Sequence, residues 1–369
     1  MDGSLSRLGD VDTPIRLLGF ALFTFLFVRA LRASENQPAR SAGWVLATVG
    51  LAALTLLGMV AALNYVVNPF GLYAPRLFEP IVLHSRAEKM RLYRLAEPPP
   101  DIVVLGNSSG FTIPPAYITE MTRRTAFNAS LHGGVPQDYL AFLNYMASIG
   151  KVPKLVIVML AVEQARPNLP AGFEPHDPLE PYLERSSGHL LAGARWLLTL
   201  DQTLASIRVL MAEARGRPAP HYRFDADGWG HFADADASLE QLVNDYLAKG
   251  WGPELFSFRA LDSNQLSYFR RFLERARRLG IKVVVYVPPL HPRAVALYDR
   301  ETNLPVLKTD LLERLHAWQA GGLIAAAYDF SRVESFGGHA GEFHDLAHPT
   351  AEASRRMLDV MLRRLPPGL

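Results

Sequence analysis

Three polar side chains in this sequence have the types and spacing that suit nucleophilic chemistry at an acyl group. Ser108 lies in the segment GNSSG at 106–110, and Asp345 and His348 lie in the segment DLAHP at 345–349. A serine hydroxyl becomes a strong nucleophile when an imidazole takes its proton, and the imidazole needs a carboxylate to hold its other nitrogen. Each segment alone also fits an ordinary polar turn, but the combination is much rarer. It predicts a catalytic triad.

The C-terminal segment also suggests a metal site as an alternative. Four of its side chains have the chemistry of ligands: His339, His344, Asp345 and His348. His344 and His348 are four residues apart, which on a helix would place both on one face. The glycines around them favour a loop, and the glutamate of the H-E-x-x-H motif is absent. Because the chain also has no cysteine for a thiolate site, we expect neither a metal nor a cofactor.

The elements that must position these residues alternate along the chain. Short, continuous apolar runs predict strands buried on both faces, at 101–106, 154–160 and 281–287. Apolar residues at helical spacing predict helices at 137–149, 263–279, 304–320 and 350–365. This alternation is typical of an α/β fold with a mostly parallel sheet and helices on both faces. Ligands bind at the carboxyl ends of such strands, and Ser108 directly follows the first one.

The stretch 166–262 interrupts this rhythm and predicts an inserted cap region over the strand ends. It is rich in Pro, Gly, His and Asp, with helical pieces at 190–214 and 239–248. Its aromatic side chains suit either stacking on sugar rings or packing within the cap, and both interpretations stay open. These residues are Tyr222, Phe224, Trp229, Phe232 and Trp251.

The N-terminal part contains a segment long and apolar enough to cross a membrane. Residues 42–63 carry no charge, and at 1.5 Å per residue they cover the roughly 30 Å of a bilayer core. A shorter apolar run at 17–28 fits either an interfacial helix or a second span. Three arginines precede the long segment, at positions 29, 32 and 40, and predict a cytoplasmic N-terminus. The large C-terminal part is then expected outside the cytoplasmic (inner) membrane.

This pattern divides the 369 residues into four parts. We expect a cytoplasmic or interfacial segment at 1–41, a transmembrane helix at 42–67, a juxtamembrane connection at 68–100 and the α/β domain at 101–369. Lys and Arg number 38 against 36 Asp and Glu, which gives a net charge of +2. Since this balance provides no strongly basic surface, we expect no nucleic-acid partner.

The segments around the serine and the histidine together resemble those of the SGNH/GDSL hydrolase superfamily. That family has a first block like Gly-Asp-Ser-Leu and a last block Asp-x-x-His, which match residues 106–109 and 345–348. A middle block, FNASLHGG at 127–134, is similar to the family's N-x-x-x-x-G. The resemblance covers about 101–365 apart from the insertion.

This resemblance implies a flavodoxin-like three-layer sandwich, the SGNH hydrolase fold. It implies that Ser108 is the nucleophile, His348 the base and Asp345 the partner that orients the base. The backbone amides of Ser108 and Gly133 would form the oxyanion hole.

One block departs from the family pattern. The G-x-N-D block expected after the second predicted strand reads LAVE at 160–163, so Val162 stands where the family has asparagine. The side-chain donor of the oxyanion hole is therefore missing, a loss that typically costs about 10²–10³ in rate. Asn107 and Asn128 are the candidates to replace it.

The α/β-hydrolases provide a competing resemblance, because they also use a G-x-S-x-G segment. Their His-Gly-Gly oxyanion loop precedes the nucleophile, whereas HGG follows it here, at 132–134. Their aspartate and histidine are also well separated in sequence. The SGNH resemblance fits this chain better.

A hydrophobic anchor followed by such a domain resembles bacterial proteins that act on cell-surface polysaccharides, including alginate O-acetyltransferase-like proteins. The resemblance implies an O-acyltransferase or esterase, with acetyl as the expected acyl group and an exported carbohydrate as substrate. A membrane protein would supply the acyl donor. Water and a sugar hydroxyl use the same triad, so the sequence does not separate hydrolysis from transfer. The alternative is a catalytically silent carbohydrate-binding or assembly protein, which Val162 favours.

Overall fold

The computed structural model describes residues 42–70, 77–78, 85–167, 169, 173, 177–183, 197–215, 222–232, 237–248 and 252–363. By its internal contacts the chain forms two compact units. One comprises 1–82 and 190–217, and the other comprises 83–189 and 218–369. The apolar run at 17–28 and Trp251 lie outside the described residues.

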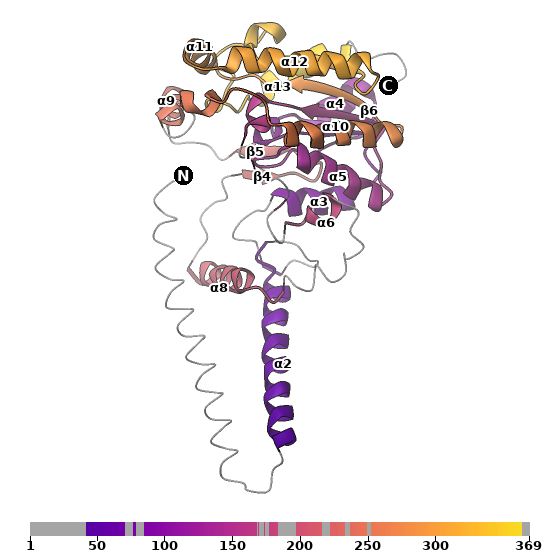
Figure 1. The fold of residues 1–369 in the computed structure, drawn as a ribbon, viewed down its shortest axis with the longest axis vertical. Coiled ribbons are helices and arrows are strands. Elements are labelled where there is room, and N and C mark those ends of the chain that lie inside the picture. The colour runs from indigo at the N-terminus through magenta and orange to yellow at the C-terminus, as the bar shows by residue number, and fades with distance from the viewer. Residues whose placement is uncertain are drawn as a thin grey trace. The chain divides into compact units, whose positions relative to one another are not determined.

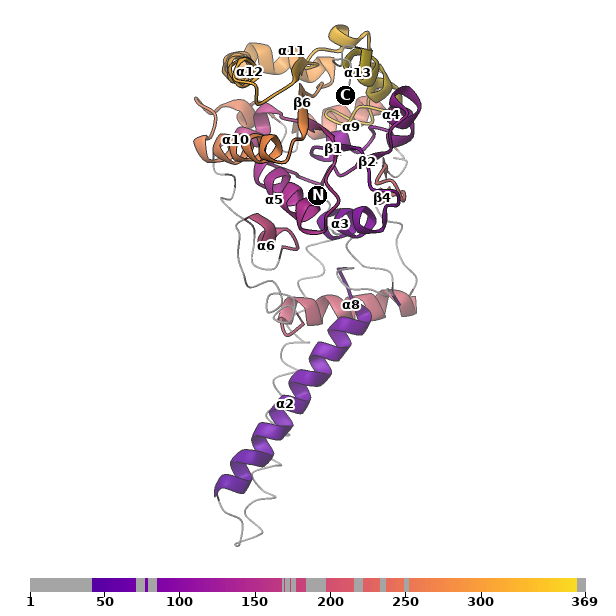
Figure 2. The same ribbon diagram turned by 90° about the vertical axis from the view of Figure 1, so that its right-hand side faces the viewer.

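The larger unit is an α/β fold built on a five-stranded parallel sheet (Figures 1 and 2). The strands are β2 (Ala126–Asn128), β1 (Ile102–Leu105), β3 (Leu155–Met159), β6 (Lys282–Val287) and β7 (Ala326–Asp329), in that spatial order. Every neighbouring pair is parallel. This is the doubly wound order of flavodoxin-like sheets, with strand order reversing beside β1. The predicted α/β class is therefore confirmed.

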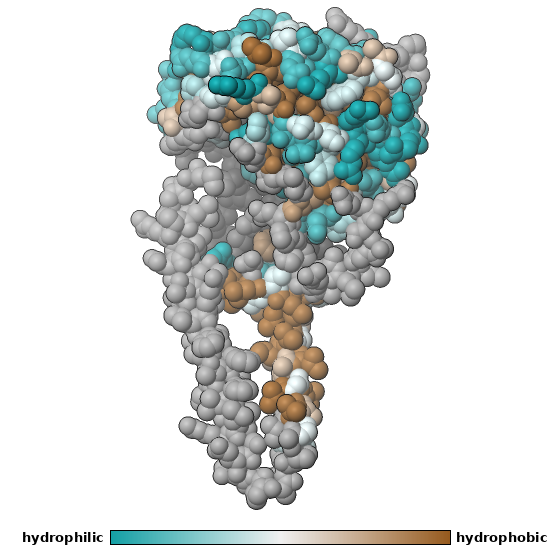
Figure 3. Space-filling model, in the orientation of Figure 1, coloured by the Kyte–Doolittle hydropathy of each residue, from teal (hydrophilic) through white to brown (hydrophobic). Residues whose placement is uncertain are grey.

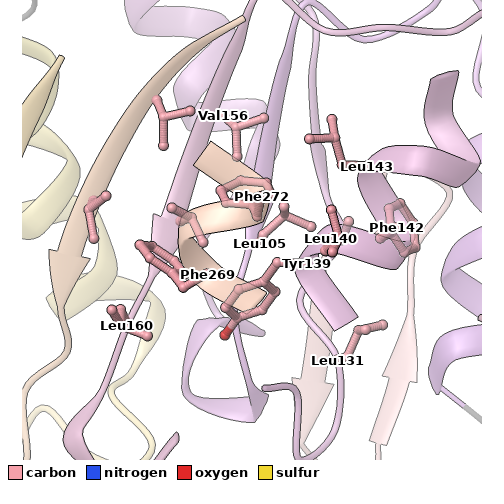
Figure 4. Close-up of a cluster of buried hydrophobic side chains, with 14 of the residues drawn as sticks. Leu105, Leu131, Tyr139, Leu140, Phe142, Leu143, Val156, Leu160, Phe269 and Phe272 are labelled. Atoms are coloured by element: carbon pink, nitrogen blue, oxygen red, sulfur yellow. The ribbon is translucent and has the colours of Figure 1, made fainter. Parts of the chain in front are cut away.

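Both faces of the sheet are covered, because alternate residues of β1 and β3 belong to two separate apolar clusters. Val103 and Val156 face the cluster that contains α5 (Pro136–Ser148), α10 (Ser263–Arg278) and α12 (Leu304–Ala320). Figure 4 shows part of this cluster, with Phe269 and Phe272 of α10 among the strand residues. The opposite cluster takes side chains from two further helices. They are α4 (Pro115–Thr122) and α13 (Ala351–Arg363).

The helix predictions for this unit are close to the observed bounds because caps mark the ends. Asp262 Oδ1 accepts a hydrogen bond from the Gln265 amide at 2.8 Å and starts α10, and Gly280, with φ +73°, follows its end. The remaining elements of the unit are α3 (Ser85–Leu95), α6 (Glu180–Leu183), α9 (Leu239–Ala248), α11 (Pro292–Glu301), β4 (Tyr222–Phe224), β5 (Gly230–Phe232) and the 3-10 helices η1 (Ser108–Gly110), η2 (Val162–Ala165), η3 (Pro253–Phe256) and η4 (Val333–Phe336).

The smaller unit consists of α2 (Ala42–Val67) packed with α8 (Leu200–Arg215). Within α2, Leu46–Val67 has a mean hydropathy of 2.2, and by length and composition it is able to cross a membrane (Figure 3). Near its end, Asn64 Nδ2 donates to Leu197 O and Thr203 Oγ1, both at 2.9 Å. The helix predicted at 190–214 as part of the insertion thus groups with the apolar N-terminal helix.

Candidate active site

The turn that carries Ser108 is held tightly at the end of β1. Asn107 Oδ1 accepts a hydrogen bond from the Ser109 amide at 2.8 Å and caps η1, which contains Ser108. Beneath the turn lies Ser130, so close that a Cβ atom on Gly110 would be 2.6 Å from its Oγ. A Cβ on Gly106 would be 3.2 Å from the same atom. The two glycines of the GNSSG segment are therefore needed for close packing under the nucleophile candidate.

The structure brings Ser108, His348 and Asp345 into one hydrogen-bonded chain. Ser108 Oγ lies 2.8 Å from His348 Nε2, although the two residues are 240 positions apart. His348 Nδ1 lies 2.7 Å from Asp345 Oδ2. Asp345 Oδ1 accepts two more hydrogen bonds, from the amides of Ala347 at 2.8 Å and His348 at 3.0 Å. These distances match the nucleophile–base–carboxylate geometry of acyl-transfer sites.

The environment of the Asp345 carboxylate determines which atoms of these three side chains carry protons. Burial raises the pKa of Asp345, but the hydrogen bond and charge of His348 and two backbone amides outweigh it, so the pKa lies below its ordinary value. Asp345 is ionised at neutral pH and is only an acceptor, so Nδ1 of His348 must donate to it. A neutral imidazole then has its lone pair on Nε2, facing the Ser108 hydroxyl.

The loop that carries His348 is braced by its own backbone and by the Ser108 side of the site. The His344 amide donates to His348 O at 2.8 Å, and the Thr350 amide donates to Glu342 O at 2.9 Å. Thr112 Oγ1, shortly after η1, donates to Pro349 O at 2.8 Å. Within the described part of the chain, no three His, Asp or Glu side chains are grouped as metal ligands.

The backbone amides expected in the oxyanion hole belong to two tight turns. Gly133 follows β2 with φ +60°, a left-handed conformation that glycine adopts without strain. In the described parts of the chain, the amides of Ser108 and Gly133 have no hydrogen-bond acceptor. Gln164 links η2 to the Gly133 turn, because its Nε2 donates to Gly134 O at 2.6 Å.

Both asparagines that are candidates to replace the missing donor already interact with other groups. Asn128 is fully buried, and its Nδ2 donates to three carbonyl oxygens of the turn after Ser108, namely Gly110 at 2.8 Å, Phe111 at 3.2 Å and Ile113 at 2.9 Å. Its amide hydrogens are spent on the backbone, so Asn128 is unsuited to bind an oxyanion. Asn107 uses Oδ1 to cap η1, and its side chain opposes the rise in the pKa of the Glu163 carboxyl group.

At the end of β3 the polar donor of the family pattern is replaced by apolar packing. Val162 is 3% exposed and belongs to the main apolar cluster. The neighbouring Glu163 is half-buried in a small hollow that it shares with Val287 and Leu290. Burial raises the pKa of Glu163 to about 7, against the opposing effects of its own amide, Arg166 and Asn107.

The β4–β5 hairpin forms one wall beside the histidine. The Gly230 amide donates to Phe111 O at 3.0 Å, which joins the hairpin to the turn after Ser108. From β5, the half-buried Phe232 ring lies 4.8 Å from the His348 ring. Trp229 is half-buried and donates through Nε1 to Thr112 O at 3.3 Å. Phe232 therefore borders the site, Trp229 is fixed to the backbone shortly after η1, and Phe224 packs edge-on against Phe111.

A buried lysine anchors this hairpin from the opposite side. Lys89 on α3 is 0% exposed, and its Nζ donates to Asn128 O at 2.8 Å and to Gly228 O. The ammonium also lies 4.0 Å from the centre of the Phe224 ring. Burial holds the pKa of Lys89 well below its ordinary value, although the charges of Asp227 and Glu88 oppose this.

Among solved structures, two that are similar to this chain are distant in sequence. No family profile matches the chain, and no curated protein is similar to it in sequence. A presumed acylhydrolase from Bacteroides fragilis is 13% identical, with a TM-score of 0.35, 76% of this chain covered and 94% of that one. A presumed platelet activating factor from Streptococcus pneumoniae is 11% identical, with a TM-score of 0.32 and coverage of 75% and 91%. Likeness at this level carries no argument, so the α/β assignment rests on the sheet topology itself.

Several residues of the site have no signal in the sequence pattern. Lys89 lies in a stretch that resembles a polar connection. Gln164 lies next to the LAVE segment at 160–163, which differs from the family's G-x-N-D block. Both act through contacts with residues distant in the chain, 39 positions away for Lys89 and 30 for Gln164. Glu163 could have been noticed as a carboxyl group directly after a buried strand.

Proposed function

We propose that this protein is a serine-dependent acyl-ester enzyme of the SGNH/GDSL type, held at a membrane by α2. Its substrate would be a cell-surface or exported carbohydrate, and its reaction O-acyl transfer or ester hydrolysis, with acetyl as the expected acyl group. The observation that carries the proposal is the chain of hydrogen bonds from Ser108 Oγ through His348 to Asp345, at 2.8 and 2.7 Å. It lies at the carboxyl end of a central parallel strand, where this architecture binds ligands.

The first half-reaction acylates the serine. Ser108 Oγ attacks the ester carbonyl carbon while His348 Nε2 takes its proton, and Asp345 stabilises the imidazolium that forms. The carbonyl oxygen becomes an oxyanion, for which the amides of Ser108 and Gly133 are the proposed donors. When the tetrahedral intermediate collapses, the ester C–O bond breaks and His348 returns the proton to the leaving alkoxide.

The second half-reaction releases the acyl group to an acceptor hydroxyl. His348 takes the proton of water or of a sugar hydroxyl, whose oxygen attacks the acyl-Ser108 carbonyl. Collapse of this intermediate breaks the bond to Ser108 Oγ, which recovers its proton from His348. The half-buried Phe232 ring beside His348 supports a sugar as the acceptor, because pyranose faces pack well on aromatic rings.

A membrane setting supports the remaining parts of the proposal. Leu46–Val67 is long and apolar enough to span a bilayer. We place the N-terminus in the cytoplasm and the α/β unit outside it, following the arginines before α2. A membrane-embedded partner would supply the acyl donor.

A second candidate function is a carbohydrate-binding or assembly protein that keeps the fold without catalysis. The buried Val162 favours it, because the side chain expected to donate to the oxyanion is replaced by an apolar one.

The two functions are separated by capture of an acyl-enzyme. The full-length protein in detergent micelles would be incubated with p-nitrophenyl acetate, quenched in acid and analysed by peptide mass spectrometry. We expect an acetyl adduct on Ser108 that is absent in Ser108→Ala and retained in Ser109→Ala, a matched control on the adjacent serine. A folded protein without an adduct on Ser108 would favour the silent function.

A further inference from the structure

Helix α8 lies crosswise at the end of the apolar helix α2 and is bonded to it (Figures 1 and 2). Asn64 of α2 is fully buried, and its Nδ2 donates to Thr203 Oγ1 of α8 and to Leu197 O just before that helix, both at 2.9 Å. Its Oδ1 accepts from Ser206 Oγ of α8 at 2.8 Å. Because α2 and α8 belong to one compact unit, these bonds fix α8 at the level of Asn64.

The level of Asn64 is that at which a bilayer core would end. From Leu46, where the apolar span begins, α2 rises about 27 Å to Asn64, close to the roughly 30 Å of a bilayer core. The exposed Tyr65 follows Asn64 directly, and the exposed Trp44 lies at the other end of the helix. Such rings favour the headgroup region on either side of a membrane. If α2 crosses a bilayer, α8 therefore lies among the headgroups.

At this level α8 has two chemically different sides. Thr203, Ser206 and Leu210 are spaced as i, i+3 and i+7, so they share the side of α8 that meets α2. Leu210 lies beyond the bonded pair and is 38% exposed. Arg208 is two residues from both Ser206 and Leu210, about 200° around the helix, and so points away from α2. The exposed Arg215 is seven residues after Arg208 and lies on that same side.

The apolar side of α8 is exposed along its length. Leu200, the first residue of the helix, is 52% exposed, and Ile207 and Met211 are half-buried. Figure 3 shows that the apolar surface of α2 continues onto the adjoining part of α8. The exposed Glu213 lies at the border between the two sides, near the end of the helix, where headgroups accommodate a charge.

We propose that α8 is an interfacial helix, with the side that carries Leu200 and Leu210 in the surface of the bilayer that α2 crosses. The partner is lipid because the bilayer surrounds α2, and Leu210 is on the side of α8 where α2 lies. This inference rests on the membrane anchoring in the proposed function and is independent of the triad. It means that the insertion between β3 and α10 returns to the membrane, 133 positions after Asn64 at its first bonded residue.

The test uses the full-length protein and single cysteines, because the chain contains none. Leu210→Cys on the proposed lipid side and Arg215→Cys, its matched control on the other side, each receive a nitrobenzoxadiazole fluorophore. Leu54→Cys, exposed within α2, and Glu334→Cys, exposed on the α/β unit, are the references for the core and for water. The proteins are reconstituted into phosphatidylcholine vesicles that contain phosphatidylcholine with a nitroxide either near the top or near the end of its acyl chain.

We expect the shallow nitroxide to quench roughly half of the Leu210 emission, since the apolar side of an interfacial helix enters about 5–10 Å into the boundary between headgroups and acyl chains. The deep nitroxide should quench it less. The Arg215 label should lose less than half as much emission as the Leu210 label. The Leu54 label should be quenched most by the deep nitroxide, and the Glu334 label by neither.

Three results would overturn the proposal. If Leu54 is quenched and Leu210 no more than Glu334, the chain is anchored but α8 lies outside the bilayer. Equal quenching of Leu210 and Arg215 would show that α8 does not present one side to lipid. A Leu210 label with blue-shifted emission that neither nitroxide quenches would show that a protein, such as a second copy of this chain, covers this side.

Two further observations keep these outcomes distinct. Leu200→Cys repeats the measurement at the other end of the apolar side, so a single variant that fails to fold does not decide the result. If the Leu54 label is itself unquenched, the anchoring in the proposed function is wrong and this inference is wrong with it. None of the labels reports on Ser108, so failure of the triad would be a separate result.

Discussion

The His348 loop and the end of β3 belong to the same α/β unit but differ in how completely their polar groups are matched. In the loop, Asp345 and His348 satisfy each other and hold the Ser108 hydroxyl at 2.8 Å. At the end of β3, Val162 is buried in the apolar cluster, and burial raises the pKa of the adjacent Glu163 to about 7. In the proposed mechanism, activation of the nucleophile and stabilisation of the oxyanion are therefore separable parts of one site. The hydrogen-bonded residues proposed for the first are all in place, whereas the second would depend on backbone amides.

The difference has a consequence for rate. A missing side-chain donor lowers the rate by about 10²–10³, which is less than the loss of a triad member. We therefore expect a slow, serine-dependent enzyme rather than an inert protein. The predictions below test the two halves of the site separately, in order of expected effect.

Removing the charge of Asp345 should have the largest effect. Asp345→Asn is expected to lower kcat/KM for p-nitrophenyl acetate by about 10³–10⁴, because the amide no longer holds His348 in the tautomer that accepts the serine proton. Asp359→Asn is the matched control, since Asp359 on α13 accepts a hydrogen bond from the Tyr117 hydroxyl on α4 rather than from His348. A loss below tenfold in Asp345→Asn would contradict the triad.

Displacing the nucleophile turn should come next. In Gly110→Ala the new Cβ would meet Ser130 Oγ at 2.6 Å, so the turn must move and kcat should fall roughly 10²-fold. Ser130 Oγ is buried and has no hydrogen-bond partner among the described residues, so its removal costs little. The double variant with Ser130→Ala should recover part of the rate. No recovery would mean that the clash is not the cause.

Restoring the missing donor tests the weaker half of the comparison. Val162→Asn is expected to raise kcat about tenfold, a fraction of what such a donor is worth in a fully adapted site. Val162→Ala, which removes the same packing without adding a donor, is the control. Equal rates in the two variants would show that position 162 does not face the oxyanion.

The smallest effect concerns stability at Glu163. Between its ordinary pKa of 4.5 and about 7, the folded protein holds a proton that the unfolded chain has lost. The contribution of protonated Glu163 to the free energy of unfolding is thus lost as the pH rises through this window. Glu163→Gln keeps the neutral form and should raise the apparent Tm by roughly 2 °C at pH 8, with no gain at pH 4.5. The same gain at both pH values, or a gain in the exposed Glu334→Gln control, would argue against it.

Continuous apolar runs were sufficient to predict three of the five sheet strands. β2 and β7 were missed because AFN and AAYD are short and contain no such run. Helix α3 was missed because its buried face includes the charged Glu88 and Lys89. Glu88 pairs with Arg91 of the same helix, but buried Lys89 is tolerated because carbonyl oxygens of Asn128 and Gly228, distant in the chain, accept its hydrogen bonds, which no local pattern reveals.

For the candidate site, too, the sequence predicted the parts that depend on local segments and missed those that depend on tertiary contacts. Ser108, Asp345 and His348 could be named from the types and spacing of residues in two short segments. The structure brings them within hydrogen-bond distance of one another, and their catalytic role stays a prediction. Asn128 was proposed as an oxyanion donor, but its amide instead holds the turn after Ser108. That use depends on which strands and helices become neighbours.

The most direct test of the central claim is whether His348 activates Ser108. The full-length protein would be treated with a fluorophosphonate probe in detergent and the modified peptide identified by mass spectrometry. We predict labelling at Ser108 in wild type and in His339→Ala, an exposed histidine near the same loop, and a loss of labelling in His348→Ala. A folded wild-type protein that stays unlabelled, or a His348→Ala variant labelled as fast as wild type, would contradict the account.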